Sequence, residues 1–275
     1  MCSLKTRTVN LIVAFYFLLF FITILFAAYG CRSATSAGSD KILLEESVYI
    51  FEDGETVSIW QFPNDSKLLY LLSDGTELMA TTVSGPGSLD QLPQATQDSI
   101  SKFYAQNGTE YNIEEYLEKA YVEYTSLEDK SSFRCYYLQQ DTFESGTNEQ
   151  VVYCTTSLLL PLGQGDYEQY YITRAFDKES GASISGWDLF YGTKDEIVSS
   201  LLFDYSNQIT DPDALIGLYE DFKPEYVRFY PDRYNIVFPA KTSLHIGRDP
   251  ISIINITGEY TEKVLSVLHG WAIPN

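Results

Sequence analysis

Residues 150–160 read QVVYCTTSLLL and residues 169–176 read QYYITRAF, and these two stretches decide the fold class. Both are rich in valine, threonine, tyrosine and phenylalanine, which favour the pleated, half-buried surface of a β-sheet. Residues 133–140 have a similar composition and precede them along the chain. Because turn-forming residues separate these runs, we predict antiparallel hairpins rather than a parallel sheet of regularly alternating strands and helices.

The chain before these strands combines further hairpins with helices. Asp53-Gly54 and Asp74-Gly75 suit the backbone of tight hairpin turns. They separate strand-like runs at residues 47–51, 56–62, 68–72 and 77–83. Helices are predicted at residues 94–106 and 113–124, the second with Asn112 as its cap and apolar residues along one face.

The remainder of the chain has a mixed pattern. Thr193-Lys194-Asp195-Glu196 forms a capping box that predicts a helix to about residue 207, and Pro212 suits the start of another. Short strands are predicted at residues 226–230, 234–238 and 251–256, and a last helix at 259–269. We therefore predict an α+β fold from about residue 43 to 269, with antiparallel strands and helices packed on one face.

The charge of the chain limits its partners. The 275 residues include 18 basic and 38 acidic side chains, which gives a net charge of -20. Binding of nucleic acid requires a basic surface, so we predict no nucleic-acid partner. After Cys31 the net charge is -22, from 16 basic and 38 acidic residues. Such a field can steer a basic protein onto the chain, and it also improves solubility, which is the simpler explanation.

The first 31 residues are predicted to tether the chain to a membrane. Lys5 and Arg7 precede an apolar run at residues 11–29, which is long enough to span the hydrocarbon core. Ala28-Tyr29-Gly30-Cys31 is similar to a bacterial lipobox, so Cys31 is a candidate for lipidation after cleavage. An uncleaved anchor is the alternative. In both cases the rest of the chain faces the cell exterior, after a flexible tether at residues 32–42.

Few residues suggest catalysis or metal binding. Only two histidines are present, and His245, which lies between apolar neighbours, is more typical of a structural than of a ligating side chain. His269 near the C-terminus is expected to be solvated. No cysteine and histidine spacing matches a zinc site and no calcium loop occurs, so we predict no metal, no cofactor and no catalytic residue.

Cys135 and Cys154 are predicted to form a disulfide across a hairpin. If the turn is centred between Glu144 and Ser145, the two cysteines lie opposite each other on antiparallel strands. An oxidising exterior permits this bond. The alternative is two buried thiols, and the register of the strands decides between them.

The aromatic pattern of the second half resembles a known bacterial module. One segment combines residues 150–160 with 170–177, Gly181 and 187–190, and another combines residues 226–230 and 234–238 with Gly247 and 251–253. This order is similar to the extracytoplasmic module of RsiV-type anti-sigma factors, which sense lysozyme. The same module accompanies PdaC-type peptidoglycan deacetylases. The chain departs from that pattern at Gly163-Gln164-Gly165-Asp166, which lacks the usual alanine and histidine, and at Pro231-Asp232-Arg233, which replaces the usual glycine.

The resemblance implies an organisation and a function. It divides the globular part into an N-terminal subdomain, residues 43–141, and a C-terminal subdomain, residues 142–275, fused near the hairpin of residues 141–165. It implies a non-enzymatic binding or sensing module at the outer face of the cell membrane. The expected ligand is a basic protein such as lysozyme or a cell-wall component. The alternative is an envelope enzyme, or an accessory domain, that acts on peptidoglycan.

Overall fold

The computed structural model describes residues 41–87, 89–206, 212–239 and 254–275. The predicted anchor, the lipidation candidate Cys31, most of the tether and His245 lie outside these ranges. Within them, no helix is long and apolar enough to cross a membrane. The fold is α+β, as predicted, with an eight-stranded sheet and a three-stranded sheet.

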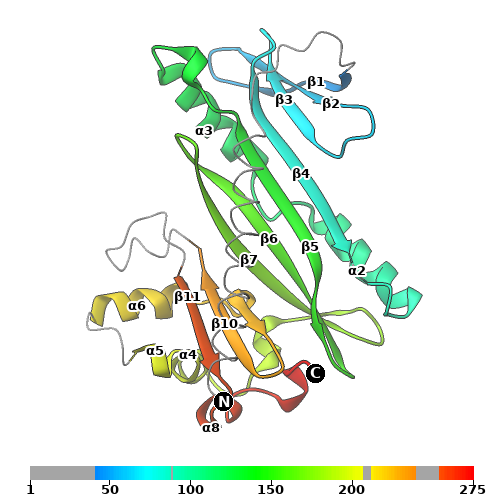
Figure 1. Ribbon diagram of the computed structural model, residues 1–275, viewed down its shortest axis with the longest axis vertical. Coiled ribbons are helices and arrows are strands. Elements are labelled where there is room, and N and C mark those ends of the chain that lie inside the picture. Colours follow the sequence, from blue (N-terminus) through cyan, green and yellow to red (C-terminus); the bar gives the residue numbers. More distant parts are fainter. Residues whose placement is uncertain (1–40, 88, 207–211, 240–253) are drawn as a thin grey trace, which may run out of the picture.

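The large sheet contains the first eight strands in chain order (Figure 1). They are β1 (Ile42–Ile50), β2 (Thr56–Gln61), β3 (Leu68–Leu72), β4 (Glu77–Gly87), β5 (Tyr136–Thr147), β6 (Val151–Gly163), β7 (Asp166–Asp177) and β8 (Ser183–Ile184). The first two hairpin turns are those predicted, since Gly54 and Gly75 have φ of 90° and 85°. The carboxylates of Asp53 and Asp74 accept hydrogen bonds from the backbone of Glu55 and Thr76 within these turns.

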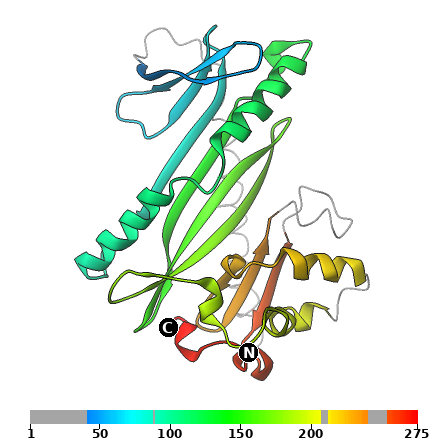
Figure 2. The same ribbon diagram turned by 180° about the vertical axis from the view of Figure 1, so that it is seen from behind.

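One strand pair of the large sheet is parallel rather than antiparallel. β4 and β5 run in the same direction, with Met79 opposite Tyr136. Parallel neighbours require a long crossover connection, and here α2 (Gln94–Asn107), α3 (Ile113–Ser126) and η1 (Lys130–Ser132) provide it. Figure 2 shows α2 and α3 along one face of the long strands. The prediction of hairpins therefore holds on either side of this connection but not across it.

The C-terminal half forms a second layer on the other face of the long strands. It contains β9 (Val227–Phe229), β10 (Arg233–Phe238) and β11 (Ile254–Glu259), paired antiparallel in the order β11-β10-β9. Its helices are η2 (Gly186–Leu189), α4 (Lys194–Leu201), α5 (Phe203–Ser206), α6 (Pro212–Asp221), η3 (Pro224–Tyr226), α8 (Glu262–Leu265) and η4 (Gly270–Ala272). The predicted capping box is present, because Thr193 and Glu196 hydrogen-bond each other's backbone.

Successive side chains of β6 and β7 point to opposite faces of the large sheet, and each face packs against its own apolar core. Tyr153 and Ala175 belong to the core that also includes α4, α6 and the three-stranded sheet. Their neighbours Cys154 and Phe176 belong to a cluster with Ile100 of α2. Each face of these strands therefore carries an apolar row: α2 and α3 cover one face, and the C-terminal layer covers the other. The proposed division at residues 141–142 stays a prediction, and β5 runs without a break across it.

The predicted disulfide between Cys135 and Cys154 is wrong in this structure. The strands pair with Glu144, and not Cys135, opposite Cys154. The hairpin turn lies at residues 148–150, where the Asn148 carboxamide accepts hydrogen bonds from two backbone N–H groups. Glu144 and Ser145, between which the turn was predicted, lie instead within β5 at a shift in register.

The two cysteines are expected to react as separate thiols. They lie in different buried clusters, and burial raises the pKa of Cys154 to about 12, so native protein will react slowly. Unfolding without reductant should expose both residues to an alkylating reagent. Peptide mass spectrometry should then find the label on both Cys135 and Cys154, and a disulfide-linked peptide pair would refute this prediction.

Candidate functional site: a polar belt and an acidic surface

The connection between α2 and α3 crosses the large sheet between two apolar cores. α2 packs Ile100 and Tyr104 onto the cluster that contains Phe176. α3 packs Tyr116, Leu117 and Ala120 onto a separate cluster. The short segment at residues 108–112 joins the two helices above the strands. Gly108 and Asn112 at its two ends are exposed, Tyr111 is buried, and two of its backbone polar groups find partners in the sheet.

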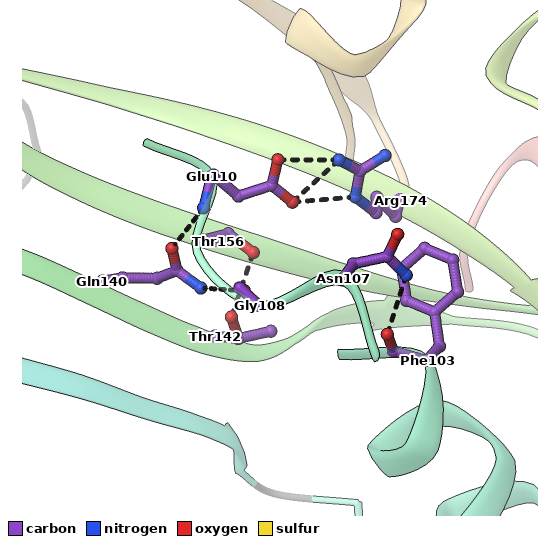
Figure 3. Close-up of polar contacts among 8 residues, drawn as sticks. All are labelled: Phe103, Asn107, Gly108, Glu110, Gln140, Thr142, Thr156 and Arg174. Atoms are coloured by element: carbon purple, nitrogen blue, oxygen red, sulfur yellow. Dashed lines mark hydrogen bonds and ion pairs between the residues drawn. The ribbon is translucent and has the colours of Figure 1, made fainter. Parts of the chain in front are cut away.

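Buried polar side chains of β5 and β6 lie beneath this segment (Figure 3). Gln140 is only 2% exposed, and its carboxamide oxygen accepts a hydrogen bond of 2.8 Å from the backbone N–H of Glu110. Its Nε2 donates to the carbonyl of Gly108 at 3.3 Å. The hydroxyls of Thr142 and Thr156 bond to each other at 3.0 Å. Gln140 therefore bonds the backbone of the crossing segment, and we call Gln140, Thr142 and Thr156, with Glu110 and Arg174, the polar belt.

Glu110 and Arg174 form the strongest polar contact of the belt. The guanidinium of Arg174 donates from Nη2 to both carboxylate oxygens, at 2.7 and 2.8 Å, and from Nε to one of them at 3.1 Å. The side chains are 16% and 26% exposed, and the Phe103 ring lies 5.8 Å from the Arg174 guanidinium carbon. Such bidentate pairs fix geometry as well as contributing energy. The pair therefore anchors the α2–α3 connection to β7.

The belt is suited to positioning rather than to chemistry. The Glu110 carboxylate is neutralised by Arg174, and the two threonine hydroxyls contact each other. The described part of the chain contains no group of three or more potential metal ligands. A cavity of about 110 Å³ lies beside the same part of β7, lined by residues that include Thr173, Ser185 and Glu225. This volume is below the range of typical small-molecule sites.

A second polar feature is an acidic surface around α3 and the β1–β2 hairpin. It consists of five carboxylates on or beside the rings of Tyr49 and Tyr121, and we call it the α3 acidic surface: Glu52, Asp53, Glu55, Glu114 and Glu118. The Tyr49 hydroxyl donates to Glu118 at 2.6 Å and the Tyr121 hydroxyl donates to Asp53 at 2.6 Å. No salt bridge within the described ranges involves these five carboxylates.

Tyr49, Tyr121 and Tyr226 are expected to make the fold sensitive to alkali. Hydrogen bonds to Glu118 and Asp53 raise the pKa values of Tyr49 and Tyr121 to about 12, and burial raises the pKa of Tyr226 to about 12. Unfolded tyrosine titrates near pH 10. Their contribution to stability is therefore complete below about pH 10 and is lost as the pH rises to about 12. Phenolate absorbance near 295 nm should rise together with loss of the far-ultraviolet circular dichroism signal, whereas tyrosines that titrate near pH 10 without unfolding would contradict this.

Neither of the two histidines indicates a catalytic or metal-binding site. His245 lies outside the described residues. His269 is half-buried rather than fully solvated, with its ring centroid 3.6 Å from that of Tyr191 and 5.3 Å from that of Trp271. Neither charged residue of the belt, Glu110 or Arg174, was predicted from the sequence. Arg174 carried a signal, because a charged residue within a predicted half-buried strand requires a partner.

Comparisons with known proteins give weak structural similarity. No protein-family model matches the chain, and no curated protein matches it. The chain is similar to the crystal structure of a DUF3298 family protein from Pseudomonas aeruginosa, at 10% sequence identity and a TM-score of 0.38, over 87% of this chain and 98% of that one. It is also similar to a DUF3298 family member from Bacteroides fragilis, at 11% identity and a TM-score of 0.40, over 84% of this chain and 93% of that one.

Proposed function

We propose that the chain is a non-enzymatic, membrane-tethered binding or sensing module at the cell exterior, and that its ligand is a basic protein such as lysozyme. The resemblance of its second half to the module of RsiV-type anti-sigma factors and PdaC-type deacetylases supports this proposal. The net charge of -22 after Cys31 supports it independently of that resemblance. A field of this size raises the association rate of a basic partner at low ionic strength.

The observation that carries the proposal is the α3 acidic surface. Glu52, Asp53 and Glu114 are exposed, and none of them is neutralised by a lysine or arginine of the described chain. The half-exposed rings of Tyr49 and Tyr121 lie among these carboxylates. Lysine and arginine side chains bind both carboxylates and the faces of aromatic rings. A basic partner would therefore find both kinds of contact on one surface.

The experiment measures binding of lysozyme to the full chain in detergent micelles. A variant carries Glu52→Gln, Glu114→Gln and Glu118→Gln, which removes three charges but keeps an acceptor for the Tyr49 hydroxyl. A matched control carries Glu149→Gln, Glu179→Gln and Asp188→Asn, which removes three exposed charges of the C-terminal half. Both variants have the same net charge, so a difference between them reports the position of the charges.

At about 50 mM salt we expect the α3 variant to bind about tenfold more weakly than the control, since each exposed charge contributes a fraction of a kcal/mol. Binding of both wild type and control should weaken at about 300 mM salt, because screening is stronger there. Equal affinities of the two variants for lysozyme would show that the binding site does not lie on the α3 acidic surface. Absence of binding at low salt would refute the basic-protein proposal.

A further inference from the structure

Arg228 is a half-buried cation held by aromatic rings. It lies on β9, beside β7, and its guanidinium carbon is 4.8 Å from the ring centroid of Tyr171 and 5.6 Å from that of Tyr230. Tyr171 alternates with Ile172, whose side chain packs with the α3 core. The Arg228 contact is therefore on the face of β7 opposite that core. Stacking on two rings restricts the guanidinium without occupying its hydrogen-bond donors.

The charge of Arg228 is not compensated within the described chain. No carboxylate there lies within 4.0 Å of its nitrogens. Its Nε is buried and has no hydrogen-bond partner. The side-chain oxygen of Asn235, which is opposite Arg228 in the strand register, is also buried and unpartnered. In a chain with a net charge of -20, a half-buried arginine without a carboxylate is unexpected and requires an explanation.

The neighbouring arginine shows the usual arrangement. The guanidinium of Arg233 lies 4.7 Å from the ring centroid of the same Tyr230, but it also donates to both carboxylate oxygens of Asp232, at 3.1 and 3.2 Å. Arg174 is likewise paired with a carboxylate, that of Glu110. Arg134, by contrast, is exposed. Arg228 alone among the described arginines combines partial burial and an aromatic clamp with the lack of a carboxylate.

We propose that Arg228, clamped between Tyr171 and Tyr230, binds a carboxylate group of an extracytoplasmic ligand. A guanidinium is planar, and its paired N–H groups match the two oxygens of a carboxylate. Because the rings already hold the side chain, little side-chain entropy is lost when the ligand binds. This site is built from different elements than the α3 acidic surface and does not depend on binding of a basic protein.

The test follows the arginine Nε–H signals of the full chain, labelled with ¹⁵N-arginine, in detergent micelles. The probes are N-acetylglycine, which carries a carboxylate, its neutral amide N-acetylglycinamide, and inorganic phosphate. Arg228→Lys assigns the Arg228 signal by its disappearance. We expect N-acetylglycine to shift that signal saturably, with half-saturation in the millimolar range, and the neutral amide to leave it unchanged. This binding is tighter than a single exposed ion pair would give, because the rings already hold the guanidinium.

Two variants test the aromatic clamp. Tyr171→Phe keeps the ring face and should bind N-acetylglycine as wild type does, whereas Tyr171→Ala should weaken binding several-fold. The signal of exposed Arg134 serves as an internal control and should not saturate. A shift of equal size with the neutral amide, an equal response of Arg134, or no shift of Arg228 would overturn the proposal. Phosphate binding as tight as that of N-acetylglycine would overturn the assignment to a carboxylate.

Discussion

Replacing Phe176 by alanine is expected to lower the free energy of unfolding by about 3–5 kcal/mol, because a fully buried aromatic ring is lost and a cavity remains. Phe176 is 0% exposed, and its ring contacts those of Phe103 and Tyr104, with centroids 5.2 and 5.9 Å apart. It therefore joins β7 to α2. Urea unfolding of the full chain, followed by circular dichroism, measures the effect.

An exposed apolar residue provides the control for this substitution. Leu265 of α8 is 45% exposed, so Leu265→Ala should cost less than about 1 kcal/mol. If Phe176→Ala costs no more than this control, α2 does not pack on β7 as described. The α2–α3 connection would then lack the support that positions it above the sheet.

Glu110→Ala is expected to destabilise the fold by about 2–3 kcal/mol. The substitution leaves Arg174, whose side chain is only 26% exposed, without a partner for its charge. Arg174→Met should cost a similar amount, because the carboxylate of Glu110 is then left 16% exposed and unpaired. The double variant should cost less than the sum, with a coupling free energy of about 1–2 kcal/mol.

The exposed pair of Arg233 and Asp232 is the control for these double-variant measurements. Arg233 and Asp232 are bonded at 3.1 Å, but their side chains are 46% and 72% exposed. Asp232→Ala should therefore cost less than about 0.5 kcal/mol, since surface ion pairs contribute little. Additive effects of Glu110→Ala and Arg174→Met would show that the pair does not act as one anchor.

Local signals in the sequence predicted most elements of the fold. Asn112 indicated the start of α3, and in the structure its side chain accepts hydrogen bonds from the backbone of Glu114 and Glu115. The Asp-Gly turns and the Thr193 capping box depend only on neighbouring residues, so they are readable without a tertiary structure. Most strands of the large sheet were predicted for the same reason, because composition and alternation are properties of each strand alone.

Features that depend on pairing between distant segments were predicted less well. The parallel pairing of β4 with β5 follows from the way α2 and α3 cross the sheet, which no local pattern encodes. The disulfide prediction depended on one turn, centred between Glu144 and Ser145, but these residues lie within β5 at a shift in register and the turn comes later in the chain. A small error in the position of the turn changes which residues lie opposite each other along the whole hairpin.

The polar belt could not be predicted from the sequence for a related reason. Glu110 and Arg174 are 64 residues apart. Glu110 resembles an ordinary surface charge in the sequence, and the place of Arg174 within a strand indicates that it needs a partner but not which residue that partner is. Gln140 likewise gave no signal, although it is buried in the centre of β5. The composition did indicate an acidic surface, because 38 acidic residues exceed what 18 basic residues can neutralise. Its concentration around α3 became apparent only from the packing of α3 beside the β1–β2 hairpin.

Hydrogen–deuterium exchange of the full chain, with and without saturating lysozyme, tests the proposed binding function most directly. Contact at the α3 acidic surface should slow exchange of backbone amides in α3 and in the β1–β2 hairpin, and leave α4 and α6 unchanged. Amides of a contact surface exchange more slowly because binding reduces local opening. Protection confined to the C-terminal layer, or no protection at a lysozyme concentration that saturates binding, would contradict the proposal.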